Sequence, residues 1–254
     1  MKIEFLGTGT SVGVPMIGCD CQVCLSNNHK DQRLRSSVKI TLDSKTIVID
    51  TSPDFRYQML RTKTTQLDAV LLTHEHKDHI NGLDDIRPFN FFSNKKIPIY
   101  ALPRVIQVIK NEYSYAFAPD TVASVPQIDL IEIEQPHFYI DNIKIIPIKI
   151  KHHPIDILGF RINDFCYITD ASSIDDVEIE KIKGAKILVL NALRLTPHPS
   201  HLTLKQAIDL VLKIQTPTVY FTHISHQLGL YDVISKQLPK HIFLAYDGLK
   251  LELD

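Results

Sequence analysis

Short apolar runs recur along the whole chain and set its expected secondary structure. Most of them are continuous rather than alternating, which is typical of strands covered on both faces. The runs that predict strands are Ile3–Leu6, Val38–Leu42, Thr46–Ile49, Ala69–Leu72, Ile143–Ile150, Phe165–Ile168, Ile187–Leu190, Val219–Phe221, Ile242–Ala245 and Leu249–Leu253.

Helices are expected in the stretches that separate these strands. The pair Ser52-Pro53 offers a capping serine and a proline at the first helical position, so a helix is predicted over Asp54–Arg61. From Pro103 onward, apolar residues repeat at close to 3.6 residues. Thr203 and Gln206 form a candidate capping box that opens a further helix.

Strands come first in each half of the chain and helices follow, which predicts an α/β (α+β) protein with a sheet-on-sheet core and helices outside. A last short helix is predicted over Gly229–Leu238, stopped by Pro239. Residues 112–142 are the least regular part, which suggests an insertion or a lid. No linker or short repeat divides the chain, so residues 1–254 are expected to form a single domain, which layered folds of roughly 250 residues often do.

Composition and charge limit the kinds of partner that the chain is expected to bind. The chain is 44% hydrophobic and 22% charged, ordinary values for a protein with a large core, and its formal net charge is -1. A nucleic acid is therefore not an expected partner, because no global positive field would attract one. No apolar window reaches the ~18 residues of a membrane helix, and the N-terminal residues do not resemble a signal peptide. We therefore expect a cytoplasmic protein without a membrane partner.

The strongest chemical signal follows the apolar run Ala69–Leu72. The segment reads Thr73-His74-Glu75-His76-Lys77-Asp78-His79, which places three imidazoles and the Asp78 carboxylate, four candidate ligands, within six residues. These side chains cannot share one face of a regular helix or strand. They can converge where a chain turns at the end of a strand, which is where open sheets place their sites. Imidazole and carboxylate together suit zinc, manganese or iron.

A second cluster of candidate metal ligands consists of cysteines. Three of the four cysteines, Cys19, Cys21 and Cys24, lie close together in a zinc loop predicted over residues 18–26. Three thiolates need one more ligand to close a tetrahedral structural zinc site, and His226 is the candidate. The alternative is a set of oxidisable thiols. Cys166, in an apolar run, is expected to be a small buried hydrophobe.

The motif His74-x-His76-x-Asp78-His79 resembles the signature of the metallo-β-lactamase superfamily. The resemblance implies a four-layer αββα sandwich that binds two divalent metals, either zinc or manganese and, as a third option, iron. By position, His74, His76 and His152 would bind one metal. Asp78, His79 and His223 would bind the other, with Asp170 bridging the two. His153 is the alternative to His152, and Asp50 matches a buried aspartate that orients a ligand histidine.

Three further segments make the resemblance narrower. They are the glycine-rich opening Gly7–Pro15, the cysteine loop, and Thr222–Gln227. Together they are similar to the PhnP family, whose activity is hydrolysis of a cyclic phosphodiester. This likeness runs from the first strand to Asp247-Gly248 and implies a small-molecule phosphodiester as the substrate. Relatives of this kind often form dimers, so a homodimer is the assembly to test.

The same resemblance assigns chemical roles. Two metals with Asp78, Asp170 and a shared hydroxide would keep roughly one positive charge, which complements a phosphodiester monoanion. Paired metals lower the pKa of a shared water and hold it in line for attack. His201, the better match, or His198 would contact the phosphate or the leaving group, and His201 as imidazolium would protonate the departing oxygen. Asp78, Asp170 and His201 are thus the expected catalytic residues.

Other functions use similar motifs. An RNA-processing nuclease of the tRNase Z type shares the metal ligands, but no long basic insertion is present here. A lactonase or thioesterase could direct the same metals at an acyl carbon. A non-hydrolytic relative of the PqqB type, active in cofactor biosynthesis, shares the cysteine cluster, although the complete ligand set argues for hydrolysis.

Overall fold

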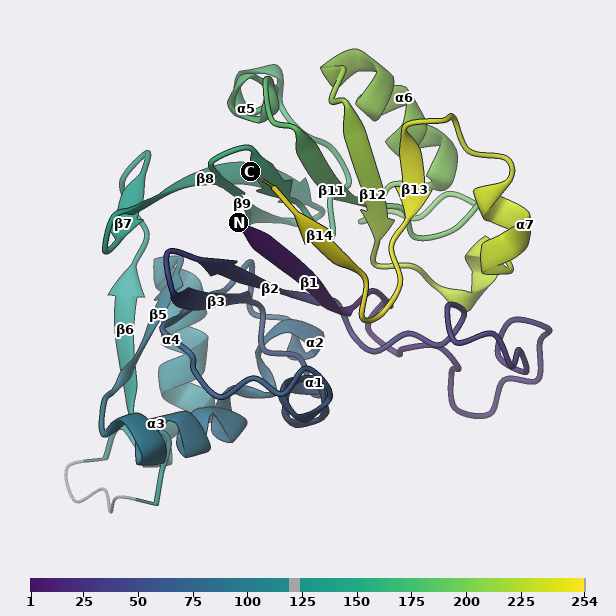
Figure 1. The fold of residues 1–254 in the computed structure, drawn as a ribbon. Helices are drawn as coiled ribbons and strands as arrows, with labels where there is room; N and C mark the ends of the chain where they lie inside the picture. The colour runs from purple at the N-terminus through teal and green to yellow at the C-terminus, as the bar shows by residue number, and fades with distance from the viewer. Residues whose placement is uncertain (119–123, 254) are drawn as a thin grey trace. The chain divides into compact units, whose positions relative to one another are not determined.

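The computed structural model describes residues 1–118 and 124–253, and its chain divides into two compact units. Unit 1 comprises residues 1–6, 37–135 and 250–254, and unit 2 comprises residues 7–36 and 136–249. Each unit contains one seven-stranded mixed sheet with its own helices (Figure 1). The prediction of a single domain is not addressed by this division and stays a prediction.

The sheet of unit 1 has the strand order β14-β1-β2-β3-β4-β5-β6. Pairing is antiparallel for β1 with β14 and for β2 with β3, and parallel from β3 through β6. The strands are β1 (Lys2–Gly7), β2 (Ser37–Leu42), β3 (Lys45–Ile49), β4 (Ala69–Leu71), β5 (Ile97–Ala101), β6 (Ile128–Glu132) and β14 (Lys250–Glu252). The termini therefore meet at one edge of this sheet, where the Met1 amino group donates to the Leu253 carbonyl oxygen at 2.6 Å.

The sheet of unit 2 mirrors this plan, with the order β13-β12-β11-β10-β9-β8-β7. Strands β7 to β10 pair antiparallel and β10 to β13 pair parallel. The strands are β7 (Phe138–Ile140), β8 (Ile143–His152), β9 (Ile155–Ile162), β10 (Phe165–Tyr167), β11 (Ile187–Asn191), β12 (Thr218–Thr222) and β13 (Ile242–Leu244). Each sheet thus has one parallel half, whose carboxyl strand ends form an edge suited to a site.

Helices pack on each sheet through an apolar core of its own. In unit 1 the core joins β3, β4 and β5 to the helical elements, and in unit 2 it joins β8 to β13 to theirs. The helices of unit 1 are α1 (Phe55–Arg61), α2 (Lys77–Ile80), α3 (Arg87–Ser93) and α4 (Pro103–Glu112), with 3-10 turns η1 (Leu83–Ile86) and η2 (Ser114–Ala116). Those of unit 2 are α5 (Asp176–Ile182), α6 (Leu204–Ile214), α7 (Tyr231–Ser235) and η3 (His226–Leu228).

The ten predicted strands are all present, with ends that shift by one or two residues. The predicted α/β class is confirmed, since each unit supplies a sheet and a set of helices. The capping box at Thr203 is also confirmed, because the Thr203 hydroxyl accepts from the Gln206 amide and the Gln206 side chain returns a contact to the Thr203 backbone. Among the described residues, no helix combines the length and apolar character needed to cross a bilayer.

Three details differ from the sequence predictions. Helix α1 begins at Phe55 rather than Asp54, because the Phe55 amide first closes a tight turn onto the Ser52 carbonyl oxygen at 2.9 Å. Helix α7 begins two residues after Gly229, whose φ of 117° does not continue a helix. The described parts of 112–142 include the edge strands β6 and β7, so this stretch is more regular than predicted, and its role as an insertion or a lid stays a prediction. Residues 119–123 of that stretch lie outside the description.

Candidate metal centres

In unit 1, Asp50 orients the metal-ligand candidate His79 through a hydrogen bond. Asp50 directly follows β3 and its Oδ2 accepts a hydrogen bond from His79 Nδ1 at 2.7 Å. Its Oδ1 accepts from the Thr73 backbone amide at 2.8 Å, and the Thr73 hydroxyl contacts both oxygens. A donor at Nδ1 leaves the His79 Nε2 lone pair available, which is the tautomer that a metal requires. Burial raises the pKa of Asp50, while the contacts with His79 and Thr73 oppose that shift.

His74 and His76 already face one another in unit 1. His74 Nε2 lies 2.9 Å from His76 Nδ1, and their ring centroids are 4.5 Å apart. The Thr73 hydroxyl lies 2.9 Å from His74 Nδ1 and so holds the far side of that ring. Two imidazole nitrogens this close, on rings steeply inclined to each other, match a pair that could share one cation at about 2.0–2.1 Å from each nitrogen.

Asp78 and His79 lie on the short helix α2, for which His76 is the N-terminal cap. Asp78 Oδ2 is 3.1 Å from His79 Nε2, so a carboxylate oxygen and an imidazole nitrogen converge at the helix start. Strand β4 is followed by a short loop and then by α2. The chain therefore changes direction at the end of the strand, and the four ligand candidates of this segment lie at the same edge of the sheet.

In unit 2, two ligand candidates occupy left-handed backbone positions just past parallel strands. Asp170 follows β10 with φ 59° and His223 follows β12 with φ 54°. Asp50 in unit 1 has the same feature, with φ 64°. Such conformations are uncommon for residues other than glycine, and they cluster at functional sites. Asp170 Oδ1 lies 3.2 Å from His223 Nε2, and the Thr10 hydroxyl is 3.3 Å from the same nitrogen.

His152 and His153 have different surroundings. His152 is buried, and its Nδ1 donates to the carbonyl oxygens of Asp170 and Ser200 at 2.7 and 2.9 Å. These bonds place the proton on Nδ1, so Nε2 carries the lone pair with which His152 would bind a cation. His153 is exposed. The surroundings of His152 therefore fit the role of ligand better than those of His153.

His201 lies beside the unit 2 ligand candidates. Its ring stacks on that of His223 with centroids 5.0 Å apart, and its Nδ1 is 3.6 Å from Asp170 Oδ1. The nearest nitrogen and oxygen atoms of His152, Asp170 and His201 also lie within 4.8 Å of one another. Burial and the neighbouring His223 lower the pKa of His201 to about 3. The ring is therefore neutral near pH 7 in the metal-free protein, and the expected imidazolium would need a bound anion to form. His198 lies next to it, with ring centroids 4.8 Å apart.

The cysteine cluster forms a compact site within unit 2. The ligand atoms of Cys19, Cys21, Cys24 and His226 all lie within 4.8 Å of one another. His226 Nδ1 is 3.3 Å from the sulfur of Cys19 and 3.3 Å from that of Cys21. The hydrogen bond with His226 lowers the pKa of Cys21 to about 6, whereas burial raises the pKa of Cys24 to about 11. None of the four cysteines forms a disulfide, and this donor set suits a structural zinc ion.

Three positioning residues were not found from the sequence. Thr73 joins Asp50 to His74, and Thr10 contacts His223, but a threonine carries no metal-binding signal by itself. Asn191, the last residue of β11, makes two hydrogen bonds to Ala171, at 2.7 Å with the amide and 3.0 Å with the carbonyl oxygen. These bonds fix the loop that carries Asp170. The only sequence signal for Asn191 was its position at the end of an apolar strand.

Comparisons with known proteins agree with this architecture. A family model described as "Beta-lactamase superfamily domain" matches residues 45–224, and the chain therefore belongs to that superfamily. A crystal structure described as a new diphosphatase from the PhnP family is 42% identical, with a TM-score of 0.93 over 98% of this chain and 96% of that one. Within the superfamily, the chain is a member of the PhnP family.

Two further relatives add context. A protein of Porphyromonas gingivalis named octanoyltransferase is 39% identical over 257 residues, which cover 100% of this chain and 52% of that protein. The chain thus spans about half the length of that relative. Zinc-bound PqqB from Methylobacterium extorquens has a TM-score of 0.82 at 19% identity and covers 100% of both chains, which shows a shared fold alone.

The family and the donor set together fit a protein that binds divalent metals. In each unit the imidazole and carboxylate groups follow strands of the parallel half of the sheet, and they suit zinc, manganese or iron. The predicted metallo-β-lactamase fold and the PhnP likeness are thus confirmed.

Proposed function

We propose that the chain is a two-metal phosphodiesterase that acts on a small or cyclic phosphodiester. Its support is a 42% identical relative in a family of phosphoryl hydrolases, together with histidines whose hydrogen bonds fix the metal-binding tautomer. His74, His76 and His152 would hold one divalent ion. Asp78, His79 and His223 would hold the other, with Asp170 as the shared ligand. Two such ions supply charge neutralisation and an activated water.

The chain's own groups account for the remaining chemistry. Asp50 holds the His79 ring, and Asn191 holds the loop of Asp170, so neither ligand must reorganise when an anion arrives. Thr10 supports His223. His201, which is neutral in the metal-free protein, would gain a proton beside a bound phosphate and then donate it to the departing oxygen.

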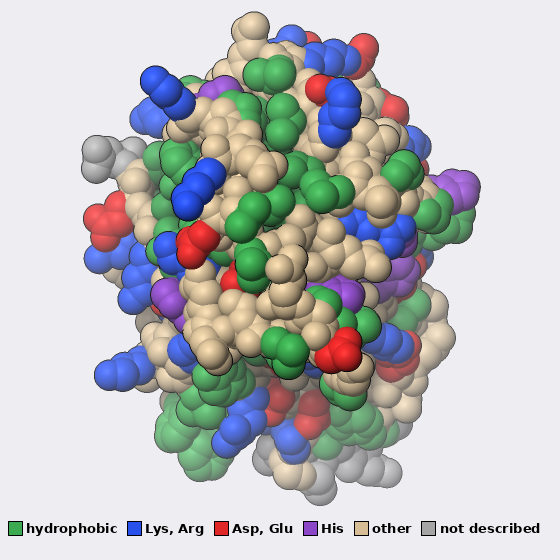
Figure 2. All heavy atoms as spheres, turned by 90° about the vertical axis from the view of Figure 1, so that its right-hand side faces the viewer, with side chains coloured by type: hydrophobic (Ala, Val, Ile, Leu, Met, Phe, Trp, Pro, Cys, Tyr) green, Lys and Arg blue, Asp and Glu red, His purple; other side chains and the backbone are tan. Residues whose placement is uncertain are grey.

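The charge balance favours a phosphodiester monoanion. Two divalent ions carry four positive charges, and Asp78 with Asp170 remove two. The site that remains is cationic and local, whereas the whole chain has a net charge of -1. On the face drawn in Figure 2, lysine and arginine side chains are spread singly and in small groups among acidic, apolar and histidine side chains. This distribution favours a small anion over a long RNA, which needs an extended basic surface.

A second substrate class has one specific observation behind it. The 42% identical relative is described as a diphosphatase, which cleaves a phosphoanhydride rather than a phosphodiester. The same two ions and the same proton donor serve both bonds, because each reaction places charge on nonbridging phosphoryl oxygens. The two classes differ in the leaving group, which is an alkoxide in one case and a phosphate in the other.

The test is a substrate panel on the protein with its metals bound. We expect hydrolysis of bis-p-nitrophenyl phosphate and of a cyclic phosphodiester, with metal analysis showing two ions in addition to the cysteine-bound one. Asp170→Ala should lose metal and activity, while Asp209→Ala, an exposed carboxylate on α6, should change neither.

Each of the other possible results of the substrate panel would assign a different function. A fully metal-loaded protein that cleaves only diphosphates moves the assignment to the second class. Activity confined to p-nitrophenyl octanoate or an acyl thioester would replace the proposal by acyl hydrolysis, the chemistry nearest to the octanoyltransferase relative. Cleavage confined to precursor tRNA would replace it by RNA processing.

A further inference from the structure

One loop of unit 2 carries two imidazoles of the proposed site. It spans residues 195–201, between β11 and α6, and it includes His198 and His201. The Leu193 amide donates to the Leu202 carbonyl oxygen at 3.0 Å and closes the base of the loop. The loop itself contains no helix or strand, so its path depends on the side chains that contact it.

Arg194, which is half-buried at the base of this loop, contacts it through its guanidinium group. Its Nε donates to the Thr196 carbonyl oxygen at 3.2 Å, and its Nη2 donates to the Pro197 carbonyl oxygen at 2.8 Å. Its Nη1 donates to Gln227 Oε1 at 2.9 Å. A guanidinium is planar and rigid, so three acceptors fix one orientation of the group. Arg194 therefore holds the two residues that precede His198.

Gln227, the third acceptor, lies next to a ligand candidate of the cysteine cluster. It directly follows His226, whose Nδ1 is 3.3 Å from two cysteine sulfurs, and both residues belong to the 3-10 turn η3. The Gln227 amide donates to the Ser225 hydroxyl at 3.0 Å, which caps the same turn. A zinc ion held by His226 would fix this turn and with it the acceptor of Arg194.

The other end of the loop reaches the ligand candidates of the proposed two-metal site. His152 Nδ1 donates to the Ser200 carbonyl oxygen at 2.9 Å, and the Ser200 amide donates to His198 Nδ1 at 3.3 Å. The His201 ring stacks on that of His223 with centroids 5.0 Å apart. A displacement at the start of the loop would therefore move two imidazoles that lie beside metal-ligand candidates.

We propose that Arg194 is a positioning residue that couples the cysteine zinc site to the loop of His198 and His201. With zinc bound, η3 holds Gln227, Gln227 orients Arg194, and Arg194 sets the path of the loop that presents His201 to the leaving group. The cysteine zinc thus acts on catalysis as well as on stability. The catalytic part of this coupling rests on the proposed function, whereas the link between zinc and loop is measurable without a substrate.

The substrate-free test is NMR of the zinc-loaded protein, isotopically labelled at histidine Cε1, with the His198 and His201 signals assigned from His198→Gln and His201→Gln. Gln227→Leu removes the acceptor of Arg194 and should shift both signals while zinc content stays complete. Gln227→Glu retains an acceptor oxygen and should leave them in place. Cys21→Ser, which removes the cysteine zinc, should reproduce the shifts of Gln227→Leu.

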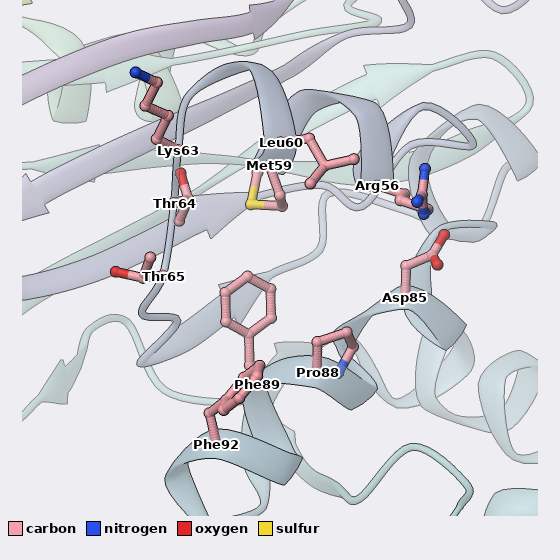
Figure 3. Close-up of a pocket in the computed structure, with 10 residues that line it drawn as sticks. All are labelled: Arg56, Met59, Leu60, Lys63, Thr64, Thr65, Asp85, Pro88, Phe89 and Phe92. Carbon is pink, nitrogen blue, oxygen red and sulfur yellow. The ribbon is translucent and has the colours of Figure 1, made fainter.

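The control for these spectra is Arg56→Ala. Arg56 is an exposed arginine on α1, where it lines an apolar hollow between α1 and α3 (Figure 3). Its removal takes away the same charge as Arg194→Ala without touching the loop. Both histidine signals should therefore stay unchanged in this variant.

Kinetics test the catalytic part. Arg194→Ala should lower kcat on an alkyl diester by about tenfold, because a displaced general acid transfers its proton poorly, and the loss on a p-nitrophenyl diester should be smaller. Metal content should stay intact. In the His201→Ala background, Arg194→Ala should cause no further loss on the alkyl diester, because both substitutions act on one proton transfer.

Three outcomes decide the matter. Unchanged histidine signals in Cys21→Ser that lacks the cysteine zinc would overturn the coupling. A full further loss of kcat when Arg194→Ala is added to His201→Ala would show that Arg194 acts independently of His201, which overturns its positioning role. Signals that shift as expected in a protein that cleaves no phosphodiester would support the coupling and overturn the proposed function alone.

Discussion

Asp50 Oδ2 accepts a hydrogen bond from His79 Nδ1 at 2.7 Å, and both groups are buried in the same unit. The bond fixes which nitrogen of His79 can bind a metal. It also links two segments, the end of β3 and the helix α2, that lie 29 residues apart in the chain. Asp50 itself binds no metal in this proposal and acts through the ring that it holds.

Asp50→Asn should weaken metal binding at the His79 site by about 10- to 100-fold, the usual effect of removing a charged partner from a ligand histidine. The asparagine amide can no longer stabilise the Nδ1–H of His79 with a full negative charge. Metal competition with a chromogenic chelator measures the change. Asp43→Asn, the same substitution at an exposed turn, is the control. Equal metal affinity in both variants would separate Asp50 from the site.

Asn191→Ala should lower the free energy of unfolding by about 1–3 kcal/mol and also reduce kcat. The substitution leaves the buried amide and carbonyl groups of Ala171 without their partner, and the loop of Asp170 then loses its fixed position. Urea unfolding and steady-state kinetics give the two quantities. A loss of stability with unchanged kcat would limit Asn191 to a structural role.

Cys21→Ser should remove the structural zinc and lower stability while the other two metals remain. A serine hydroxyl is a poor zinc ligand, and a three-ligand remnant binds weakly. The measured metal content should fall by one ion per chain, and the thermal unfolding temperature should drop. Cys166→Ser is the contrast, because burial raises the pKa of that thiol to about 12 and keeps it protonated. It should retain all of its zinc, so a loss of zinc in that variant would contradict this assignment.

His201→Ala should lower kcat by about 10²- to 10⁴-fold, the usual contribution of a general acid, and leave metal content intact. A substrate with a good leaving group, such as a p-nitrophenyl diester, needs less protonation and should be affected less. The comparison of kcat for p-nitrophenyl and alkyl diesters measures the difference. Equal losses on both would indicate that His201 binds the phosphate rather than protonating the leaving oxygen. His198→Ala, in which the neighbouring ring is lost, should have the smaller effect.

The hydrophobic pattern located ten strands of the described chain and missed four, namely the short apolar strands β5 and β7 and the mixed strands β6 and β9. Strand β9 was missed because Asp156, Gly159 and Arg161 interrupt its apolar residues. The structure shows why Gly159 is there, since a Cβ atom would lie 2.9 Å from the Tyr167 carbonyl oxygen on β10. Edge strand β6 was missed for a similar reason, with Asp129 and Glu132 on its exposed positions.

The sequence by itself determined the donor chemistry. The spacing of candidate ligands along the chain is fixed by the covalent structure, so it already predicted metal sites. The candidates are the imidazole and carboxylate groups of His74-x-His76-x-Asp78-His79 and the thiolates of Cys19, Cys21 and Cys24. Only the tertiary structure decided which nitrogen of each histidine is available. That choice depends on Asp50, Thr73 and backbone carbonyl oxygens, which come from strands that pair through long-range contacts. The hollow between α1 and α3 has no sequence signal either, because its depth depends on how two helices pack rather than on any one residue.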